Sequence, residues 1–202
     1  MKLYYTTTSP FARKVRVAAI EAGIYDGIEL VVTTVRDPES ALLPLSPAGR
    51  VPVLRTADGV VLSEATYICS YLADVHGRKP LMPTGDKRWR ALEIEGQACG
   101  LLDGVVTWVR ALRAPEELRN PKAIALEDAR VNRCLDAFDR RAGAWEGSHA
   151  VFHLPQITLG CALGALSFRL PDVDWRAGRP ALSDWWDRIS ERPSMKQTAP
   201  FE

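Results

Sequence analysis

Hydrophobic and polar residues in the first 77 positions follow two different spacings. Four short runs rich in apolar and β-branched residues predict β-strands, at 2–6, 28–34, 51–55 and 60–62. Apolar residues recur at helical spacing over 10–22 and 64–76, which predicts two helices. The Pro- and Ser-rich stretch 37–49 predicts an irregular connection, and Asp58-Gly59 is a strong hairpin signal. The order predicts an α/β unit that finishes in a hairpin and a helix.

The pattern changes after residue 77. The stretch 78–87 (RKPLMPTGDK) contains two prolines and one glycine and predicts a linker. No strand pattern appears beyond it, and helical segments are expected near 88–113, 121–145, 154–168 and 181–192. The chain therefore predicts an α/β domain over 1–77, a linker over 78–87 and an all-helical domain over 88–202.

The composition adds little that is specific. The chain has 202 residues, of which 47% are hydrophobic and 25% charged, with a formal net charge of +1. This balance gives no reason to expect nucleic acid or an anionic membrane surface as partner. No apolar run is long enough to span a bilayer, and the first residues lack the layout of a signal peptide. We therefore expect a cytoplasmic protein.

Several common kinds of site find no support in the sequence. The four cysteines are far apart and form no Cys-x-x-Cys or Cys/His metal spacing, so we expect buried free thiols and no metal. His76, His149 and His153 lie away from any Ser or Cys in nucleophile-like surroundings, which disfavours a hydrolase triad. The glycine patterns of dinucleotide and P-loop sites are absent from the sequence.

Ser9 and Pro10 stand where the first predicted strand gives way to the first helix. Ser is a preferred N-cap residue and Pro a preferred first helical residue, so Ser9 is expected to cap the helix. Its hydroxyl could also face a ligand, because a helix N-terminus attracts negative charge. Arg13, Lys14 and Arg16 follow in the first two turns. They predict either a solvated basic face paired with nearby carboxylates or cations that meet an anion.

Two further segments admit both a structural and a functional interpretation. Pro52 is tolerated at the start of a strand simply because it lies at an end; alternatively, a cis Val51-Pro52 bond would turn the Val51 backbone toward an extended, peptide-like ligand. Ser63 is expected to cap the second helix, with Glu64 and Thr66 in its first turn. In the functional interpretation, Glu64 and the free amides of that helix hold an ammonium and a carboxylate.

Three segments together carry a specific resemblance: TSPFARKVRVAA, SPAGRVPVL and LSEATYICSYL. In order and spacing they resemble the cytosolic glutathione transferases, and the C-terminal LGCALGALSFRL and RPALSDWWDRISERPS resemble the end of a bacterial, serine-type member. The resemblance covers essentially the whole chain. It implies a thioredoxin-like N-terminal domain, an all-helical C-terminal domain, a homodimer, and a detoxifying enzyme that joins glutathione to a small electrophile.

The resemblance also implies roles for individual residues. Ser9 matches the catalytic serine, whose hydroxyl, with the helix N-terminus, would stabilise the glutathione thiolate without a metal. The positions matched to glutathione binding are Arg50, Val51, Pro52, Glu64 and Ala65. Of these, Val51 lies beside the cysteinyl part, and Glu64 and Ala65 lie at the γ-glutamyl end. The candidates for the electrophile pocket are Phe11, Trp108 and Arg110; for Trp108, packing in the core is an equal alternative.

The sequence departs from the family pattern in two places. Ala65 stands where many members have a serine whose hydroxyl binds the γ-glutamyl carboxylate, so we expect weakened glutathione affinity. His153-Leu154-Pro155-Gln156 replaces the usual Ser/Thr-x-x-Asp capping box. Gln156 can still reach back to the N-cap amide, but His153 is a poor cap, so we expect a less stable helical domain. The absence of cysteine from residues 6–11 argues against the cysteine-type members.

Two other functions stay open on the sequence. Glutathione-dependent reduction of disulfides or peroxides occurs in some members without an active-site cysteine and would release oxidised glutathione. The same two-domain fold also serves as a non-catalytic interaction module. Ser9, Val51-Pro52 and Glu64 argue against the module, whereas Ala65 favours it.

Overall fold

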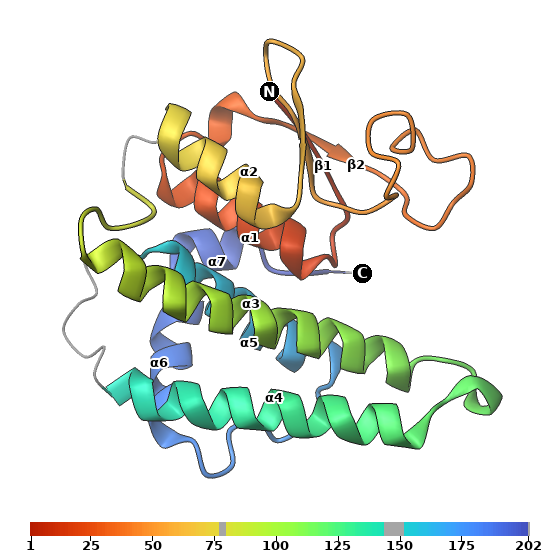
Figure 1. Cartoon of the computed structure of the whole chain (residues 1–202), viewed down its shortest axis with the longest axis vertical. Helices are drawn as coiled ribbons and strands as arrows, with labels where there is room; N and C mark the ends of the chain where they lie inside the picture. The colour runs from red at the N-terminus through yellow and green to blue at the C-terminus, as the bar shows by residue number, and fades with distance from the viewer. Residues whose placement is uncertain (77–79, 144–151, 202) are drawn as a thin grey trace. The chain divides into compact units, whose positions relative to one another are not determined.

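The computed structural model describes residues 1–76, 80–143 and 152–201. The chain forms two compact units (Figure 1): the first contains Met1–Pro83 together with the residues from Gln197 onward, and the second contains Thr84–Lys196. The C-terminal end therefore groups with the first unit, which the expected division of the chain did not anticipate. No helix in the described ranges is long and apolar enough to cross a membrane.

In the described part of the chain, the first unit is built on a four-stranded mixed sheet. β1 (Lys2–Tyr5) pairs in parallel with β2 (Glu29–Val32) and antiparallel with β3 (Val53–Arg55). β3 pairs antiparallel with β4 (Val61–Ser63), which gives the strand order β2-β1-β3-β4. This is the thioredoxin-like arrangement predicted from the sequence.

Two helices accompany the sheet. α1 (Pro10–Glu21) connects β1 to β2, and α2 (Ala65–Tyr71) follows β4 and continues into a π-helical turn, Leu72–His76. The two helices contact each other and lie side by side in Figure 1. A 3-10 turn, Tyr25–Gly27, precedes β2. The core of this unit includes fully buried side chains from both layers, Leu3, Val15, Leu54 and Ile68.

Local sequence explains both ends of α1. Ser9 has extended backbone angles (φ −78°, ψ 116°), its side chain accepts a hydrogen bond from the Ala12 amide, and Pro10 opens the helix. At the other end, Gly23 adopts a φ of 74°, and the Gly23 and Ile24 amides bond to carbonyls of the last turn. A positive φ after a helix favours glycine, which has no Cβ to clash. The predicted cap and helix are confirmed.

The second unit is helical throughout its described residues. Its elements are α3 (Lys87–Leu112), a 3-10 turn (Glu116–Leu118), α4 (Pro121–Ala142), α5 (Leu154–Arg169), α6 (Pro180–Ser190) and α7 (Pro193–Gln197), which ends at the boundary of the unit. α5 packs against α3 and α6, and over 154–166 every residue except Gln156 is buried. The four predicted helical segments are confirmed; the predicted end at 145 lies outside the described residues, and α7 was not predicted.

A polar cluster joins α4 to α6. Arg179, which is 9% exposed, donates to Asp136 Oδ1 at 2.7 Å and to Asn132 Oδ1 at 2.9 Å. Arg179 also stands at the N-cap position of α6, where its side chain makes no capping bond. Asp139 of α4 supplies that acceptor instead, because its Oδ1 accepts from the Leu182 amide at 2.9 Å.

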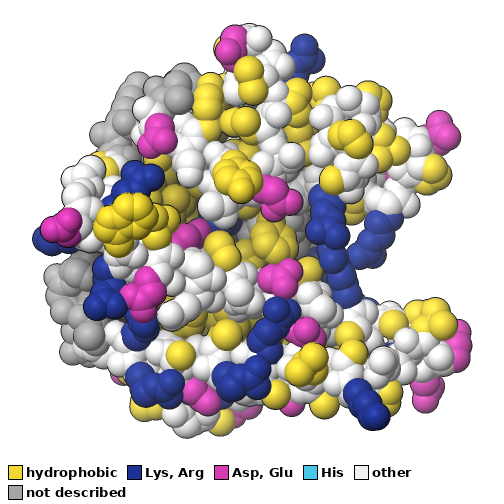
Figure 2. Space-filling view, in the orientation of Figure 1, with side chains coloured by type: hydrophobic (Ala, Val, Ile, Leu, Met, Phe, Trp, Pro, Cys, Tyr) yellow, Lys and Arg dark blue, Asp and Glu magenta, His cyan; other side chains and the backbone are white. Residues whose placement is uncertain are grey.

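All four cysteines are free thiols; Cys69 and Cys161 are buried, whereas Cys99 and Cys134 are half-buried, so the expectation of burial is met by two of the four. Burial raises the pKa of the Cys134 thiol. Among the described residues, no group of three or more His, Cys, Asp or Glu side chains could hold a metal ion. Acidic and basic side chains are interspersed on the face shown in Figure 2.

Candidate functional site

Three predicted site segments leave the sheet at the same edge. Val53, the first residue of β3, pairs with Tyr4 near the end of β1 and with Ser63 at the end of β4. The chain from β1 to Ser9, the chain that enters β3 from Pro52, and the turn into α2 are therefore neighbours. We call this the Ser9 edge of the sheet. It brings the Ser9 segment together with two segments that follow it by more than forty positions in the sequence.

Ser9 is half-buried at the N-terminus of α1. Its Oγ lies 3.2 Å from the Ala12 amide nitrogen and accepts a hydrogen bond from it. A hydroxyl that accepts in this way still holds its own proton and can donate it to a second partner. The amides and the dipole of the helix add partial positive charge at the same place. Ser9 can therefore stabilise an anionic atom, such as a thiolate, at the Ser9 edge.

The peptide bond between Val51 and Pro52 is cis, as the functional interpretation of this segment requires. Pro52 is buried, Val51 is half-buried and Arg50 is exposed. β3 begins directly after Pro52, so the Val51 backbone lies at the Ser9 edge. Arg50, the residue before Val51, adds an exposed guanidinium next to this segment.

The turn from β4 into α2 passes through Glu64, which has a φ of 69° and a ψ of 121°. Residues with a Cβ rarely adopt positive φ, and holding one there costs about 1–3 kcal/mol. Glu64 is exposed and its side chain makes no capping bond, while Ala65 is 4% exposed. The prediction that Ser63 caps α2 is wrong. Ser63 still pairs with Val53 in the sheet, so the helix begins one residue later than the local sequence suggests.

The three cations of α1 are buried. Arg13 and Arg16 are each 7% exposed, and Lys14 is 1% exposed. The interpretation as a solvated basic face is wrong, because this part of the helix packs against other segments of the first unit. Arg13 Nε donates to Thr198 Oγ1 at 3.4 Å, and Arg16 Nε donates to Tyr25 OH at 3.1 Å.

Lys14 reaches α2. Its Nζ lies 3.3 Å from Thr66 Oγ1, and Thr66 is exposed at the second position of α2, directly after Ala65. A buried cation therefore lies behind the first turn of α2. Sequence reasoning placed Thr66 in this turn but missed its pairing with Lys14. The two residues are 52 positions apart, and no local pattern links them.

Comparison with known proteins identifies the family. Residues 8–75, which include Ser9, Val51-Pro52 and the turn into α2, match the model for the glutathione S-transferase N-terminal domain. The full structure is similar to that of a glutathione transferase family member from Pseudomonas fluorescens Pf-5, with a TM-score of 0.91 and 33% sequence identity over 100% of this chain and 99% of that chain. The chain belongs to the glutathione transferase family.

A second structure of the Pseudomonas protein and one further relative extend this comparison. The Pseudomonas neighbour holds bound glutathione, and a second structure from the same organism holds S-(propanoic acid)-glutathione; it matches with a TM-score of 0.89 and 33% identity over 100% of both chains. The GST-like protein YibF of Escherichia coli K12 is 26% identical over 201 residues, which cover 99% of this chain and 98% of that protein. The similarity therefore extends through both units of the transferase fold.

The residues that the resemblance assigns to the electrophile pocket lie in both units. Phe11 is half-buried in the first turn of α1, and Trp108 and Arg110 lie near the end of α3. Arg110 is exposed, whereas Trp108 is 6% exposed. Trp108 Nε1 has no hydrogen-bond partner among the described residues. The burial of the Trp108 ring agrees with its core-packing interpretation.

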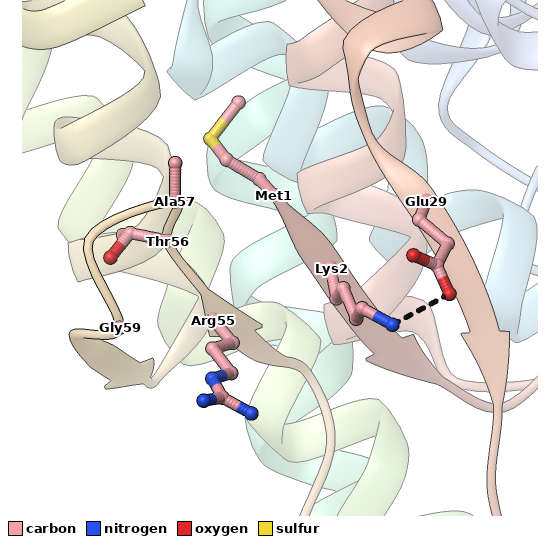
Figure 3. Close-up of a pocket in the computed structure, with 7 residues that line it drawn as sticks. All are labelled: Met1, Lys2, Glu29, Arg55, Thr56, Ala57 and Gly59. Carbon is pink, nitrogen blue, oxygen red and sulfur yellow. Dashed lines mark hydrogen bonds and ion pairs between the residues drawn. The ribbon is translucent and has the colours of Figure 1, made fainter.

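The opposite edge of the sheet carries a surface hollow of about 390 Å³ (Figure 3). It is lined by Met1, Lys2, Glu29, Arg55, Thr56, Ala57 and Gly59. Lys2 pairs with Glu29 and with Arg55 across the sheet, so this hollow lies at the end away from the Ser9 edge. Lys2 Nζ and Glu29 Oε1 form a solvated ion pair at 3.0 Å, which contributes at most about 1 kcal/mol. None of the predicted site residues lines this hollow.

Proposed function

We propose that this chain is a glutathione transferase that ionises the thiol of glutathione at the Ser9 edge and adds the thiolate to a small electrophile. The observation that carries the proposal is the position of Ser9. It is half-buried at the start of a 12-residue helix, and its hydroxyl oxygen accepts a hydrogen bond from the Ala12 amide. The Pseudomonas neighbours, which hold glutathione and an S-substituted glutathione, support the same ligand here.

Glutathione would lie across the first unit with its sulfur at Ser9. The Val51 backbone would pair with the cysteinyl part, because an extended peptide can continue the hydrogen bonding of a strand edge. The exposed Glu64 carboxylate would bind the γ-glutamyl ammonium beside Ala65. Arg50, which is exposed, would add a cation near a ligand that carries two carboxylates.

The stabilisation required at the sulfur is within reach of these groups. A free thiol has a pKa of about 8.5, so most glutathione is protonated at neutral pH. Lowering the pKa by about two units requires about 2.7 kcal/mol of differential stabilisation. A charge-assisted hydrogen bond from Ser9 contributes about 1.5–3 kcal/mol, and a helix N-terminus about 0.3–1 kcal/mol. Ser9 and α1 are therefore sufficient without an acid–base pair.

The rest of the proposal concerns the second substrate and the assembly. Phe11 of the first unit and Trp108 and Arg110 of the second stay the candidates for electrophile binding that the family resemblance implies. A homodimer belongs to the same proposal, because the family resemblance implies one. A cytoplasmic location and a role in detoxification belong to the same proposal.

The test is calorimetric titration of the folded protein with reduced glutathione, followed by product analysis with a panel of small electrophiles. Saturable binding and formation of a thioether are the expected results. Release of oxidised glutathione without thioether would favour the reductase instead. Absence of glutathione binding would contradict the proposal and favour the interaction module.

A further inference from the structure

A positive charge is buried behind the first turn of α2. Lys14, in the second turn of α1, is 1% exposed and is one of the largest fully buried side chains of the described residues. Burying an ammonium group is costly unless hydrogen bonds or negative charge compensate it, and an apolar side chain would fill the same space without that cost. Lys14 Nζ donates to Thr66 Oγ1 at 3.3 Å, so part of the compensation comes from α2.

The neighbouring cations of α1 make contacts in other directions. Arg13 Nε donates to Thr198 Oγ1 near the C-terminus, and Arg16 Nε donates to Tyr25 OH in the turn before β2. Of the hydrogen bonds described for these three cations, the one made by Lys14 leads to α2 and the Ser9 edge. Lys14 therefore contributes a positive charge behind α2.

Thr66 connects this charge with the surface. Its oxygen accepts from the Lys14 ammonium, while the residue itself is exposed. A hydroxyl that accepts from a cation is polarised and becomes a stronger donor, because hydrogen bonds in a chain reinforce one another. Thr66 directly follows Ala65, the position matched to a serine that binds the γ-glutamyl carboxylate. Its hydroxyl is therefore one residue away from the hydroxyl that this chain lacks.

We propose that Lys14, acting through Thr66, positions the α-carboxylate of the γ-glutamyl group of glutathione. The pair takes the place of the hydroxyl that is absent at Ala65, given that glutathione binds as in the proposed function. Lys14 is a positioning residue, because it meets the ligand through Thr66 and has no part at the sulfur. The affinity of the site should therefore depend on that one carboxylate and on the charge behind it.

The test compares two thiols by calorimetric titration of the full chain. One is reduced glutathione, and the other is γ-aminobutanoyl-Cys-Gly, which lacks only the carboxylate in question. The unaltered protein should bind glutathione about tenfold more tightly than the analogue, as expected for one charge-assisted hydrogen bond. Lys14→Met, which fills a similar volume without charge, should remove most of this preference and leave the affinity for the analogue within about twofold.

Variants of Thr66 separate the proposed role from a structural one. Thr66→Val should also remove the preference, and Thr66→Ser, which keeps the hydroxyl, should retain it. Thr66 is exposed, so these variants decide the question even if Lys14→Met does not fold. Arg16→Met is the matched control, because it removes a cation that is 7% exposed from the same helix, and the contacts described for Arg16 are with Tyr25 and the Tyr5 ring rather than with α2. It should keep the full preference for glutathione.

The outcomes distinguish this role from the proposed function itself. Full preference for glutathione in Lys14→Met or Thr66→Val would overturn the role of Lys14 and leave the transferase intact. Equal binding of both thiols by the unaltered protein would do the same. Failure of the folded, unaltered protein to bind either thiol would contradict the proposed function, and the role of Lys14 would fall with it.

Discussion

His153 occupies the N-cap position of α5 without capping the helix. Its backbone is extended (φ −77°, ψ 168°), as a cap requires, but its side chain makes no capping hydrogen bond. Gln156, at the third helical position, is of a type that can reach back to the N-cap amide. It makes no such bond in the structure, because Gln156 Oε1 is buried and has no hydrogen-bond partner in the described ranges. The N-terminus of α5, the most extensively buried of the described helices, therefore lacks a side-chain cap.

The double substitution His153→Thr with Gln156→Asp should stabilise the protein. A threonine hydroxyl can accept from the amide of the third helical residue, which is the nearest target because Pro155 has no N–H. This cap is worth about 1 kcal/mol. The aspartate removes a buried, unpartnered oxygen and can accept from the N-cap amide, which together contribute about 1 kcal/mol more.

The expected gain of about 2 kcal/mol can be measured as a shift of the melting temperature. For a chain of about 200 residues, each kcal/mol corresponds to about 2–4 °C, so the double variant should melt about 4–8 °C higher. Circular dichroism of the helical signal is a suitable probe. The two single variants complete a double-mutant cycle, whose coupling energy reports the reciprocal bonds of the capping box.

His153→Ala is the control for this experiment, since it removes the imidazole without adding a cap. It should melt close to the unaltered protein. The reasoning is refuted if the double variant melts at or below the unaltered protein. A rise in His153→Ala as large as in His153→Thr would show that removing the imidazole, rather than capping α5, is what stabilises the fold.

Burial lowers the pKa of His153, so the folded protein favours the neutral imidazole. The folding stability that this preference contributes is present above about pH 6.5 and is lost as the pH falls through the lowered pKa. The melting temperature should fall over that range, and fall less in His153→Thr. Asp139→Ala removes the carboxylate that accepts from the Leu182 amide and should lower the melting temperature by about 2–4 °C, for a cap worth about 1 kcal/mol; an unchanged value would contradict this role. Ala65→Ser restores the hydroxyl that many transferases have there and should raise glutathione affinity about fivefold in calorimetric titration, and no gain would show that Ala65 does not weaken the site.

Signals that act over a few residues were sufficient to predict much of the first unit. Ser9-Pro10 and Gly23 set the ends of α1, because a cap, a ring-fixed φ and a positive φ are properties of single residues. Asp58-Gly59 likewise marks the hairpin between β3 and β4, where Gly59 has a φ of 90°. These features depend little on the rest of the fold.

The errors arose where distant segments decide the local structure. Ser63 is a good cap by type, but its pairing with Val53 keeps it in the sheet, so Glu64 takes the N-cap position and the helix starts at Ala65. The cations of α1 look solvated in sequence, yet Lys14 is buried through contact with a residue 52 positions away. α7 was missed because five residues are too few to show helical periodicity.

The most direct test of the account is the pKa of the glutathione thiol when it is bound, followed by the absorbance of the thiolate as a function of pH. The unaltered protein should hold this pKa about two units below the value of a free thiol, near 8.5, and Ser9→Ala should raise it by at least about one unit. Asn120→Ala is the control, because it removes an N-cap of α4, where Asn120 Oδ1 accepts from the Lys122 amide at 3.0 Å, and should leave the thiol unchanged. An equal pKa in the unaltered protein and in Ser9→Ala would contradict the central role of Ser9.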